Sequence, residues 1–417
     1  MAEPTEHTRP RSSHGHSIAL LALAYVGFVS LGLPDAVLGV VWPSLRDAFS
    51  LPQAALGAPL AASAISYFLS GMLAGTLMRR AGLGVLLAGS TALVTLAVAG
   101  FSLTPGFGLF LVAGCLGGFG SGAIDAALNS YVARNFGARH MTWLHAAYSV
   151  GAALGPAIMT AVLARGAPWR TGYAVLAGIL GVLAVCFTIT RRSWEGGPSA
   201  TDEPSAEAAP TGPLTEAPPH VLRRGRVWLQ MAIFFVYTGV EVSAGQWAFT
   251  VLTEARGVDA TRAGTWVSLY WASLMAGRVV LGFIVERVGP VLLVRLATAL
   301  AVLGVALFAV PGLPPALGFA GLAALGFALA PIYPGLMAET PRRMGPVHAP
   351  HAVGFQVSCA TAGCAALPSL GGLIGQRMGL GTIPIFVAGC TVLLALLHET
   401  LVATVDGPVR GARRTPA

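Results

Sequence analysis

Twelve apolar stretches divide this chain of 417 residues, and each is about 20 residues long, the length that an α-helix needs to cross a membrane. Hydrophobic residues make up 55% of the chain and charged residues only 10%, against about 25% charged residues in soluble domains. We therefore predict an all-α polytopic membrane protein with twelve transmembrane helices. The stretches lie near residues 18–42, 54–78, 84–103, 107–133, 141–164, 169–190, 227–252, 263–285, 290–310, 315–338, 351–376 and 380–403.

One polar segment separates the first six stretches from the last six. Ser193 to Leu222 contains six prolines, five acidic residues and no arginine, a composition that cannot bury enough apolar surface to fold. We predict a flexible cytoplasmic linker between two six-helix bundles. The expected division is an N-terminal tail at 1–17, bundles at 18–192 and 227–404, the linker at 193–226 and a C-terminal tail at 405–417.

Arginine supplies all 25 basic residues, and its distribution predicts the orientation. If both termini lie inside, 17 arginines fall in inner segments and 6 in outer loops. The positive-inside rule then places both termini in the cytoplasm and the chain in the plasma (inner) membrane. The same distribution explains the net charge of +8 without a nucleic-acid-binding patch.

The two sets of six stretches share a signature. Gly75 to Gly82 (GTLMRRAG) closes the second stretch, and Gly282 to Gly289 (GFIVERVG) closes the eighth, 207 residues later. A second, weaker repeat relates the segment Gly151 to Pro156 (GAALGP) to the segment Gly363 to Pro368 (GCAALP). Six plus six helices with matching signatures are typical of parallel-repeat transporters.

The fourth stretch carries the most informative pattern. Small residues recur at every fourth position from Gly114 to Ser130, so one helix face lets another backbone approach closely. Asp125 and Asn129 form a second i, i+4 pair in otherwise apolar surroundings. A carboxylate there normally faces a bundle interior or a wet cavity. We reject a dinucleotide-binding loop at Gly118 to Ala123, because no soluble βαβ unit surrounds it.

Three acids lie inside apolar stretches and are candidate functional residues. Burial disfavours the charged carboxylate, so Asp125 and its partner Asp35 are suited to gaining and losing a proton. Asp35 follows Pro34, and a structural role, in which the acid binds amides freed by the proline, is the alternative. Glu241 suits solute hydroxyls, while a pairing with Arg278 that holds the two halves together is its alternative.

These motifs resemble the major facilitator superfamily over nearly the whole chain. The motif G-x-L-x-x-R-x-G after the second stretch and GxxxGP in the fifth carry the resemblance, although Arg79 stands where the loop motif normally has an aspartate. The segment from Asp125 to Tyr131, with the region around Asp35 and the segment from Tyr237 to Trp247, is similar to the fucose permease branch of sugar–proton symporters. Here Asp125 replaces that permease's glutamate.

The resemblance implies a secondary transporter that moves a sugar or sugar-like solute by proton-coupled alternating access. The expected solute-binding residues are Asn129, Tyr148, Glu241, Gln246, Trp247, Tyr270, Trp271, Tyr333 and Gln356, and the expected gating residues are His145, Arg278, Glu286 and Arg287. On a straight helix Glu241 and Trp247 point in different directions, so we expect the seventh helix to unwind between Gly239 and Gly245. Pro331 and Pro334 predict a second broken helix.

Other functions fit the sequence less well. An exporter of drugs or metabolites is the alternative within transport, because the GxxxGP motif is frequent in exporters. No GxxxxGK[ST], HExxH or GxSxG motif occurs, so we expect neither ATP hydrolysis nor an enzyme. The five cysteines lie in apolar stretches without metal-ligand spacing, and we expect no metal or cofactor. The expected partners are a small solute, protons (with sodium left open) and the lipid bilayer, and we expect a monomer.

Overall fold

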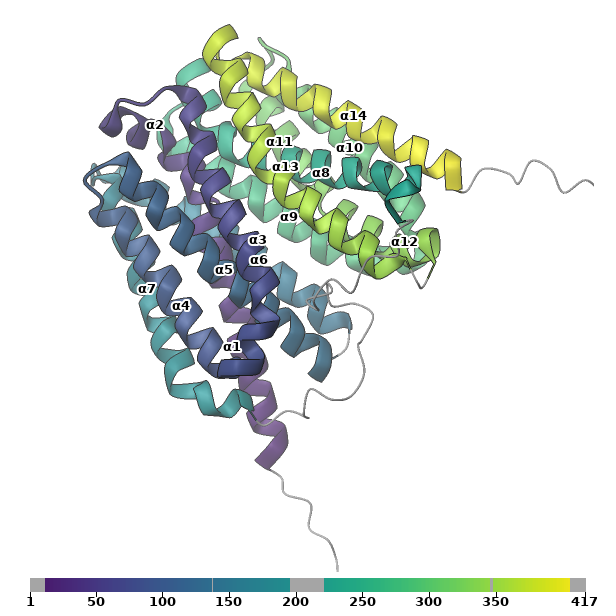
Figure 1. Ribbon diagram of the computed structural model, residues 1–417. Helices are drawn as coiled ribbons and strands as arrows, with labels where there is room; N and C mark the ends of the chain where they lie inside the picture. Colours follow the sequence, from purple (N-terminus) through teal and green to yellow (C-terminus); the bar gives the residue numbers. More distant parts are fainter. Residues whose placement is uncertain (1–11, 137, 196–220, 346–347, 406–417) are drawn as a thin grey trace, which may run out of the picture.

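The computed structural model describes residues 12–136, 138–195, 221–345 and 348–405. Within these ranges the chain forms helices joined by turns and contains no strand. The described residues include twelve helical segments that are long and apolar enough to cross a membrane, which confirms the predicted fold class. Figure 1 shows the segments gathered in two halves, α1–α7 and α8–α14.

The bounds of the helices agree closely with the apolar stretches of the sequence. The N-terminal half contains α1 (Ser12–Asp35), α2 (Val37–Phe49), η1 (Gln53–Leu56), α3 (Gly57–Ala81), α4 (Leu83–Leu103), α5 (Phe107–Asn135), α6 (Ala138–Ala164), α7 (Trp169–Thr190) and η2 (Arg191–Glu195). The C-terminal half contains η3 (Val221–Arg223), α8 (Gly225–Thr250), η4 (Val251–Ala255), α9 (Ala260–Val288), α10 (Pro290–Ala309), α11 (Pro315–Leu329), α12 (Ile332–Met344), α13 (Ala349–Met378) and α14 (Thr382–Val405).

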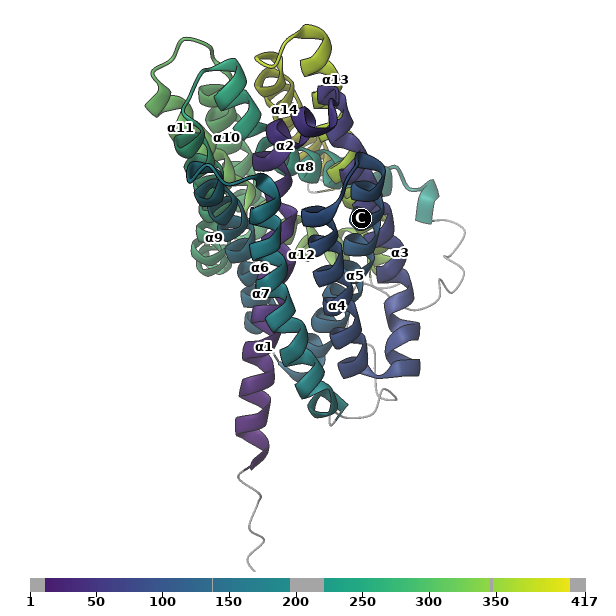
Figure 2. The ribbon, with the colours of Figure 1, turned by 90° about the vertical axis from the view of Figure 1, so that its left-hand side faces the viewer.

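The expected domain boundaries lie close to helix ends. α1 begins at Ser12, inside the expected N-terminal tail, and projects past its neighbours (Figures 1 and 2). α8 begins at Gly225, near the expected end of the linker. The middle of that linker, 196–220, and most of both tails lie outside the described residues.

Two membrane crossings are built from two helices each. The first crossing breaks between α1 and α2 at Ala36, directly after Pro34 and Asp35, because proline lacks the N–H that would continue the helical ladder. The tenth crossing breaks between α11 and α12 at Ala330 and Pro331, which confirms the predicted break there.

The internal repeat is visible in the backbone at two equivalent turns. Gly82 joins α3 to α4 at φ 83°, and Gly289 joins α9 to α10 at φ 81°. Residues with a Cβ rarely adopt this conformation, so the final glycine of each loop motif is required for the turn. We call this end of the molecule, where α1 also begins, the Gly82 end. The opposite end, where α2 ends, is the Ser50 end.

Small residues bring helix backbones together in the N-terminal half. A Cβ added to Gly118 or Gly122 of α5 would collide with the main chain of Ser63 or Tyr67 in α3. A Cβ added to Gly151 or Gly155 of the GxxxGP motif in α6 would likewise collide with the main chain of α1. The stripe predicted in the fourth stretch therefore packs α5 against α3.

The two halves are tied to each other at the Ser50 end. Arg46 at the end of α2 forms an ion pair with Glu254 of η4 at 2.9 Å, and Gln53 donates to the same carboxylate at 3.1 Å. The amide of Ala54 donates to Gln376 of α13 at 3.1 Å. In Figure 1, α3 and α13 lie together near α2 and diverge toward the Gly82 end.

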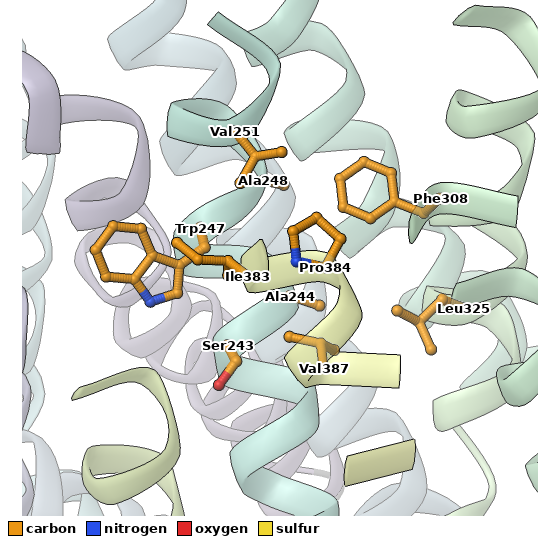
Figure 3. Close-up of a pocket in the computed structure, with 10 residues that line it drawn as sticks. All are labelled: Ser243, Ala244, Trp247, Ala248, Val251, Phe308, Leu325, Ile383, Pro384 and Val387. Atoms are coloured by element: carbon orange, nitrogen blue, oxygen red, sulfur yellow. The ribbon is translucent and has the colours of Figure 1, made fainter. Parts of the chain in front are cut away.

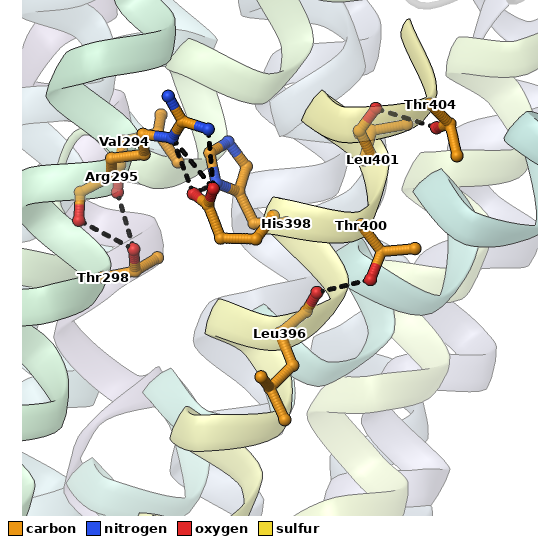
Figure 4. A network of polar contacts seen from close by, with 9 residues as sticks. Val294, Arg295, Thr298, Leu396, His398, Thr400, Leu401 and Thr404 are labelled. Carbon is orange, nitrogen blue, oxygen red and sulfur yellow. Dashed lines mark hydrogen bonds and ion pairs between the residues drawn. The ribbon is translucent and has the colours of Figure 1, made fainter. Parts of the chain in front are cut away.

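A polar cluster lies between α10 and α14 on the C-terminal half (Figure 4). The guanidinium of Arg295 binds both carboxylate oxygens of Glu399, with Nη2–Oε2 at 2.6 Å and Nε–Oε1 at 2.7 Å. His398, only 1% exposed, lies beside this pair with its Nδ1 at 3.4 Å from Glu399. These contacts hold α10 against α14 and are separate from the centre of the molecule.

Candidate functional site

Asp35 is positioned by the break in the first crossing. Its side chain leaves the chain where α1 ends, and the hydroxyl of Tyr148 in α6 donates to Oδ2 at 3.1 Å. Its main-chain carbonyl accepts a hydrogen bond from Gln246 of α8 at 3.0 Å. Two other helices therefore bind Asp35, α6 at its side chain and α8 at its main chain.

Asp125 lies on α5 with the partner that the sequence predicts. Asn129, one turn later, donates its Nδ2 to Oδ1 of Asp125 at 3.0 Å. Tyr67 of α3 lies within electrostatic range of the Asp125 carboxyl. The close approach of α3 and α5 at Gly122 brings the backbone that carries Tyr67 next to α5.

The two acids share one region, and open space reaches it. Asp35 interacts electrostatically with Asp125, and it also lies within range of Cys364 on α13. Neighbours from α5, α6 and α13 thus surround Asp35, and yet its side chain is exposed. Gln246 of the other half binds the Asp35 main chain, so we expect this exposed carboxyl to face the space between the two halves. Acids normally occupy such wet positions in membrane proteins.

Glu241 forms the opposite wall, on α8 of the C-terminal half. The hydroxyl of Tyr237 donates to its carboxylate, and the hydroxyl of Tyr270 in α9 donates to its main-chain carbonyl at 2.8 Å. Arg278, also on α9, approaches its Oε1 to 3.8 Å. The predicted pairing of Glu241 with Arg278 is therefore present, but it lies within one half and does not join the two halves.

Arg278 nevertheless spans the interface through its other nitrogen. Nη1 donates to the hydroxyl of Ser149 in α6 at 2.7 Å, and the carbonyl of His145 lies at 3.4 Å. The His145 side chain is exposed toward the same interior and its ring meets Phe28 edge to face. Arg278 thus connects the acid of the C-terminal half with α6 of the N-terminal half.

Tyr333 follows the break in the tenth crossing and joins this wall. Its ring packs against Phe234 at 5.0 Å and Tyr237 at 6.0 Å between ring centroids. It lies within electrostatic range of both Asp125 and Glu241. The residues that the structure brings together are Asp35, Asp125, Asn129, His145, Tyr148, Glu241, Tyr270, Arg278 and Tyr333.

The structure does not show the unwinding that we expected in the seventh crossing. α8 is a continuous helix from Gly225 to Thr250, and only its last turn widens into the π-type turn η4. Trp247 is 1% exposed and its indole N–H donates to the carbonyl of Pro368 at 2.9 Å, inside the C-terminal half. It therefore points away from Glu241, as the helical phase of an unbroken helix requires.

The space beside Trp247 is too small for a solute. The cavity there has a volume of about 10 Å³ and is lined almost entirely by apolar side chains, among them Phe308, Leu325 and Val387 (Figure 3). That volume holds about one water molecule at most. We therefore regard this cavity as part of the packing of the C-terminal half.

Three other expected residues lie apart from the central cluster. Gln356 is 1% exposed, and its amide forms hydrogen bonds with Gln230 and Thr340 inside the C-terminal half. Both polar atoms of the amide therefore already have partners. Trp271 is 4% exposed and packs against Gly245. Arg287 is exposed at the Gly82 end of α9, and the side chain of Glu286 lies outside the described residues.

Two residues of the cluster were missed in the sequence. Tyr67 is a single tyrosine in an apolar stretch, which is equally typical of an interface anchor. Ser149 directly follows Tyr148 in the sequence, and only Tyr148 was predicted as a site residue. For Tyr67 the available signal was the glycine stripe of α5, because Gly122 meets the main chain of Tyr67. No three His, Cys, Asp or Glu side chains in the described ranges are placed to hold a metal ion.

Comparisons with known proteins agree with this architecture. The yeast protein "Bypass of stop codon protein 6" from Saccharomyces cerevisiae is 23% identical over 402 residues, which cover 88% of this chain and 79% of the yeast protein. The crystal structure of a mutant of the nucleoside transporter NupG matches 93% of this chain and 99% of its own with a TM-score of 0.75 and 15% identity.

The E. coli fucose:proton symporter FucP matches 92% of this chain and 98% of its own, with a TM-score of 0.60 and 17% identity. At these identities the likeness shows the fold and does not distinguish one transporter branch from another. The family model of the Major Facilitator Superfamily matches residues 24–368, which include most of both halves. This chain therefore belongs to the Major Facilitator Superfamily of membrane transporters.

Proposed function

We propose that this transporter moves a small polar solute, a sugar or a similar hydroxyl-rich compound, together with protons by alternating access. One observation carries the proposal: Asp35 and Asp125 lie within electrostatic range of each other inside apolar helices, and each carboxyl accepts a hydrogen bond from a neutral group, Tyr148 at Asp35 and Asn129 at Asp125. An ionised carboxylate is costly in apolar surroundings unless it is hydrogen-bonded or hydrated. A change in access to water therefore changes the affinity of each acid for a proton.

The opposite wall suits solute hydroxyl groups. Glu241, Tyr333 and Arg278 supply acceptors and donors from the C-terminal half, and Asn129 supplies an amide from the N-terminal half. A few placed polar groups among aromatic rings are the usual composition of a small-molecule site. The structural similarity to NupG, a nucleoside transporter, and to FucP, a fucose:proton symporter, supports a solute of this class.

The sidedness of the arginines supports a cytoplasmic Gly82 end in the plasma (inner) membrane. Among the described residues, hydrogen bonds between the halves lie at the Ser50 end and in the middle of the molecule. The form with its Ser50 end closed is then the form that faces the cytoplasm.

Export of a drug or metabolite is the second candidate. The GxxxGP motif of α6 favours it by analogy, but Gly151 and Gly155 use their lack of a side chain to pack on the main chain of α1. This packing role serves an importer equally well, so the motif does not distinguish the two directions.

Uptake into proteoliposomes under an imposed pH gradient tests the proposal, with a panel of radiolabelled sugars and nucleosides. The wild type should accumulate one class of solute, and replacement of the proton gradient by a sodium gradient should not support accumulation. Asp125→Asn should abolish accumulation and retain counterflow exchange. Asp47→Asn, which removes an exposed aspartate at the Ser50 end, is the matched control. Full gradient-driven accumulation by Asp125→Asn would contradict the assignment.

A further inference from the structure

Gln246 makes an unusual contact between the two halves. Its side chain is 3% exposed, and Nε2 donates to the main-chain carbonyl of Asp35 at 3.0 Å. Its Oε1 has no hydrogen-bond partner. The amide therefore does not form part of the solute wall that we expected from the sequence; it is directed at the backbone of the residue that we assign to proton coupling.

The carbonyl that Gln246 binds is one that the helix break leaves free. Asp35 is the last residue of α1, and carbonyl groups at a helix end need partners from outside the helix. Pro34 weakens the ladder at the same place. A donor from α8 thus holds the main chain of Asp35, while Tyr148 of α6 holds its carboxyl.

The same residue marks the closest approach of α2 and α8. A Cβ added to Gly39 would lie 2.7 Å from Cα of Gln246 and 2.6 Å from its carbonyl oxygen. Only glycine allows the two backbones to touch here. Because α2 and α8 belong to different halves, any separation of the halves at the Ser50 end breaks the contact at Gly39 and the hydrogen bond to Asp35 together.

We propose that Gln246 is a positioning residue that couples closure of the Ser50 end to the proton site, because it holds the Asp35 main chain across the interface. The inference rests on the proposed function. When the Ser50 end opens, the break between α1 and α2 loses its external partner, and the carboxyl of Asp35 is free to move relative to Tyr148. Protonation of Asp35 and closure of the Ser50 end are then linked in both directions.

Several titratable groups lie within electrostatic range of Asp35. The titratable groups that face it are Tyr67 from α3, Asp125 from α5, Tyr148 from α6 and Cys364 from α13. None of them reaches across to the Asp35 backbone in the described contacts, and α8 contributes the neutral amide of Gln246. A change at Gln246 therefore alters the link without removing a charge.

Distance measurements between spin labels test the link on the full chain in nanodiscs, without knowledge of the solute. Labels at Pro105→Cys and Pro311→Cys, in a background without the native cysteines, report the separation of two exposed loops at the Ser50 end. The wild type should shift between closed and open populations as the pH changes. In Gln246→Met the populations should no longer depend on pH.

Gln230→Met is the matched control, because Gln230 is a second buried glutamine of α8 that binds Gln356 within its own half. It should keep the wild-type pH profile. Gly39→Ala leaves the amide intact but separates the two backbones, and it should lose the pH dependence as Gln246→Met does.

The outcomes separate the inference from the proposed function. A wild-type profile in Gln246→Met, or an equal loss in Gln230→Met, overturns the role of Gln246. If Gln246→Met does not fold, the test passes to Gly39→Ala. A wild-type pH profile in Gly39→Ala then overturns the role of Gln246. A wild type without any pH dependence contradicts proton coupling itself, and the inference falls with it.

Discussion

The ion pair between Arg46 and Glu254 should determine how firmly the Ser50 end stays closed. Glu254→Gln removes the charge that Arg46 faces at 2.9 Å and that Gln53 also binds. The two partners are partly buried, with side chains 19% and 27% exposed. Their interaction therefore falls between the values for exposed and fully buried pairs, and we estimate about 1–2 kcal/mol.

This free energy stabilises only the closed form, because Arg46 and Glu254 belong to different halves. Since about 1.4 kcal/mol corresponds to a factor of ten, Glu254→Gln should raise the ratio of open to closed molecules roughly 5- to 30-fold. The spin-label pair at Pro105→Cys and Pro311→Cys measures that ratio directly as a gain of the longer distance.

The control is Asp47→Asn, which removes the other carboxylate beside Arg46. Asp47 is 72% exposed, lies in the same half as Arg46 and pairs with it at 3.0 Å. Its loss should change the ratio by less than about twofold, as for exposed ion pairs. An unchanged ratio in Glu254→Gln, or an equal shift in Asp47→Asn, would refute the reasoning.

Three further predictions concern stability and solute binding. Glu399→Gln removes the carboxylate that Arg295 binds and should cost up to about 1 kcal/mol of stability, because both side chains are nearly half exposed; the loss is seen as a lower midpoint of thermal unfolding in detergent. Gly82→Ala forces a side chain into φ 83° and should lower the same midpoint, at a cost of about 1–3 kcal/mol. Trp247→Phe should lower stability but leave the apparent KM for the solute unchanged. Glu241→Gln should raise the apparent KM, measured in transport assays.

The fold follows from the sequence because few architectures satisfy its constraints. Twelve apolar stretches require helices, and two copies of the loop motif 207 residues apart require two equivalent halves. The turn at Gly82 and its repeat at Gly289 adopt the same backbone conformation. Each inference relied on length, periodicity or a glycine, which are properties that the sequence shows directly.

The candidate site was predictable where the cost of a buried charge identified it. Asp35, Asp125 and Glu241 are conspicuous in apolar helices, and the structure gathers all three at the centre. Polar residues without charge were harder to assign. Gln356 pairs with Gln230, a residue 126 positions away, and no local pattern shows such a pair.

The error at Trp247 came from an added assumption about the backbone. The helical phase alone places Glu241 and Trp247 on different faces, and the expected unwinding at Gly239 and Gly245 was required to bring them together. The structure instead uses both glycines for packing, since Gly239 meets Leu367 and Gly245 meets the indole of a neighbouring helix. Glycine in a membrane helix was a sign of close contact here.

α6 connects the proton site with the solute wall through two successive residues. Tyr148 donates to Asp35 in the N-terminal half, and Ser149 accepts from Arg278 in the C-terminal half. Consecutive residues on a helix point about 100° apart, so one turn of α6 faces both groups at once. Arg278 in turn lies beside Glu241. Under the proposed function, we expect a solute that draws Arg278 or Glu241 out of this arrangement to act on the same turn that orients the Asp35 carboxyl, and so to affect the protonation of Asp35 without direct contact.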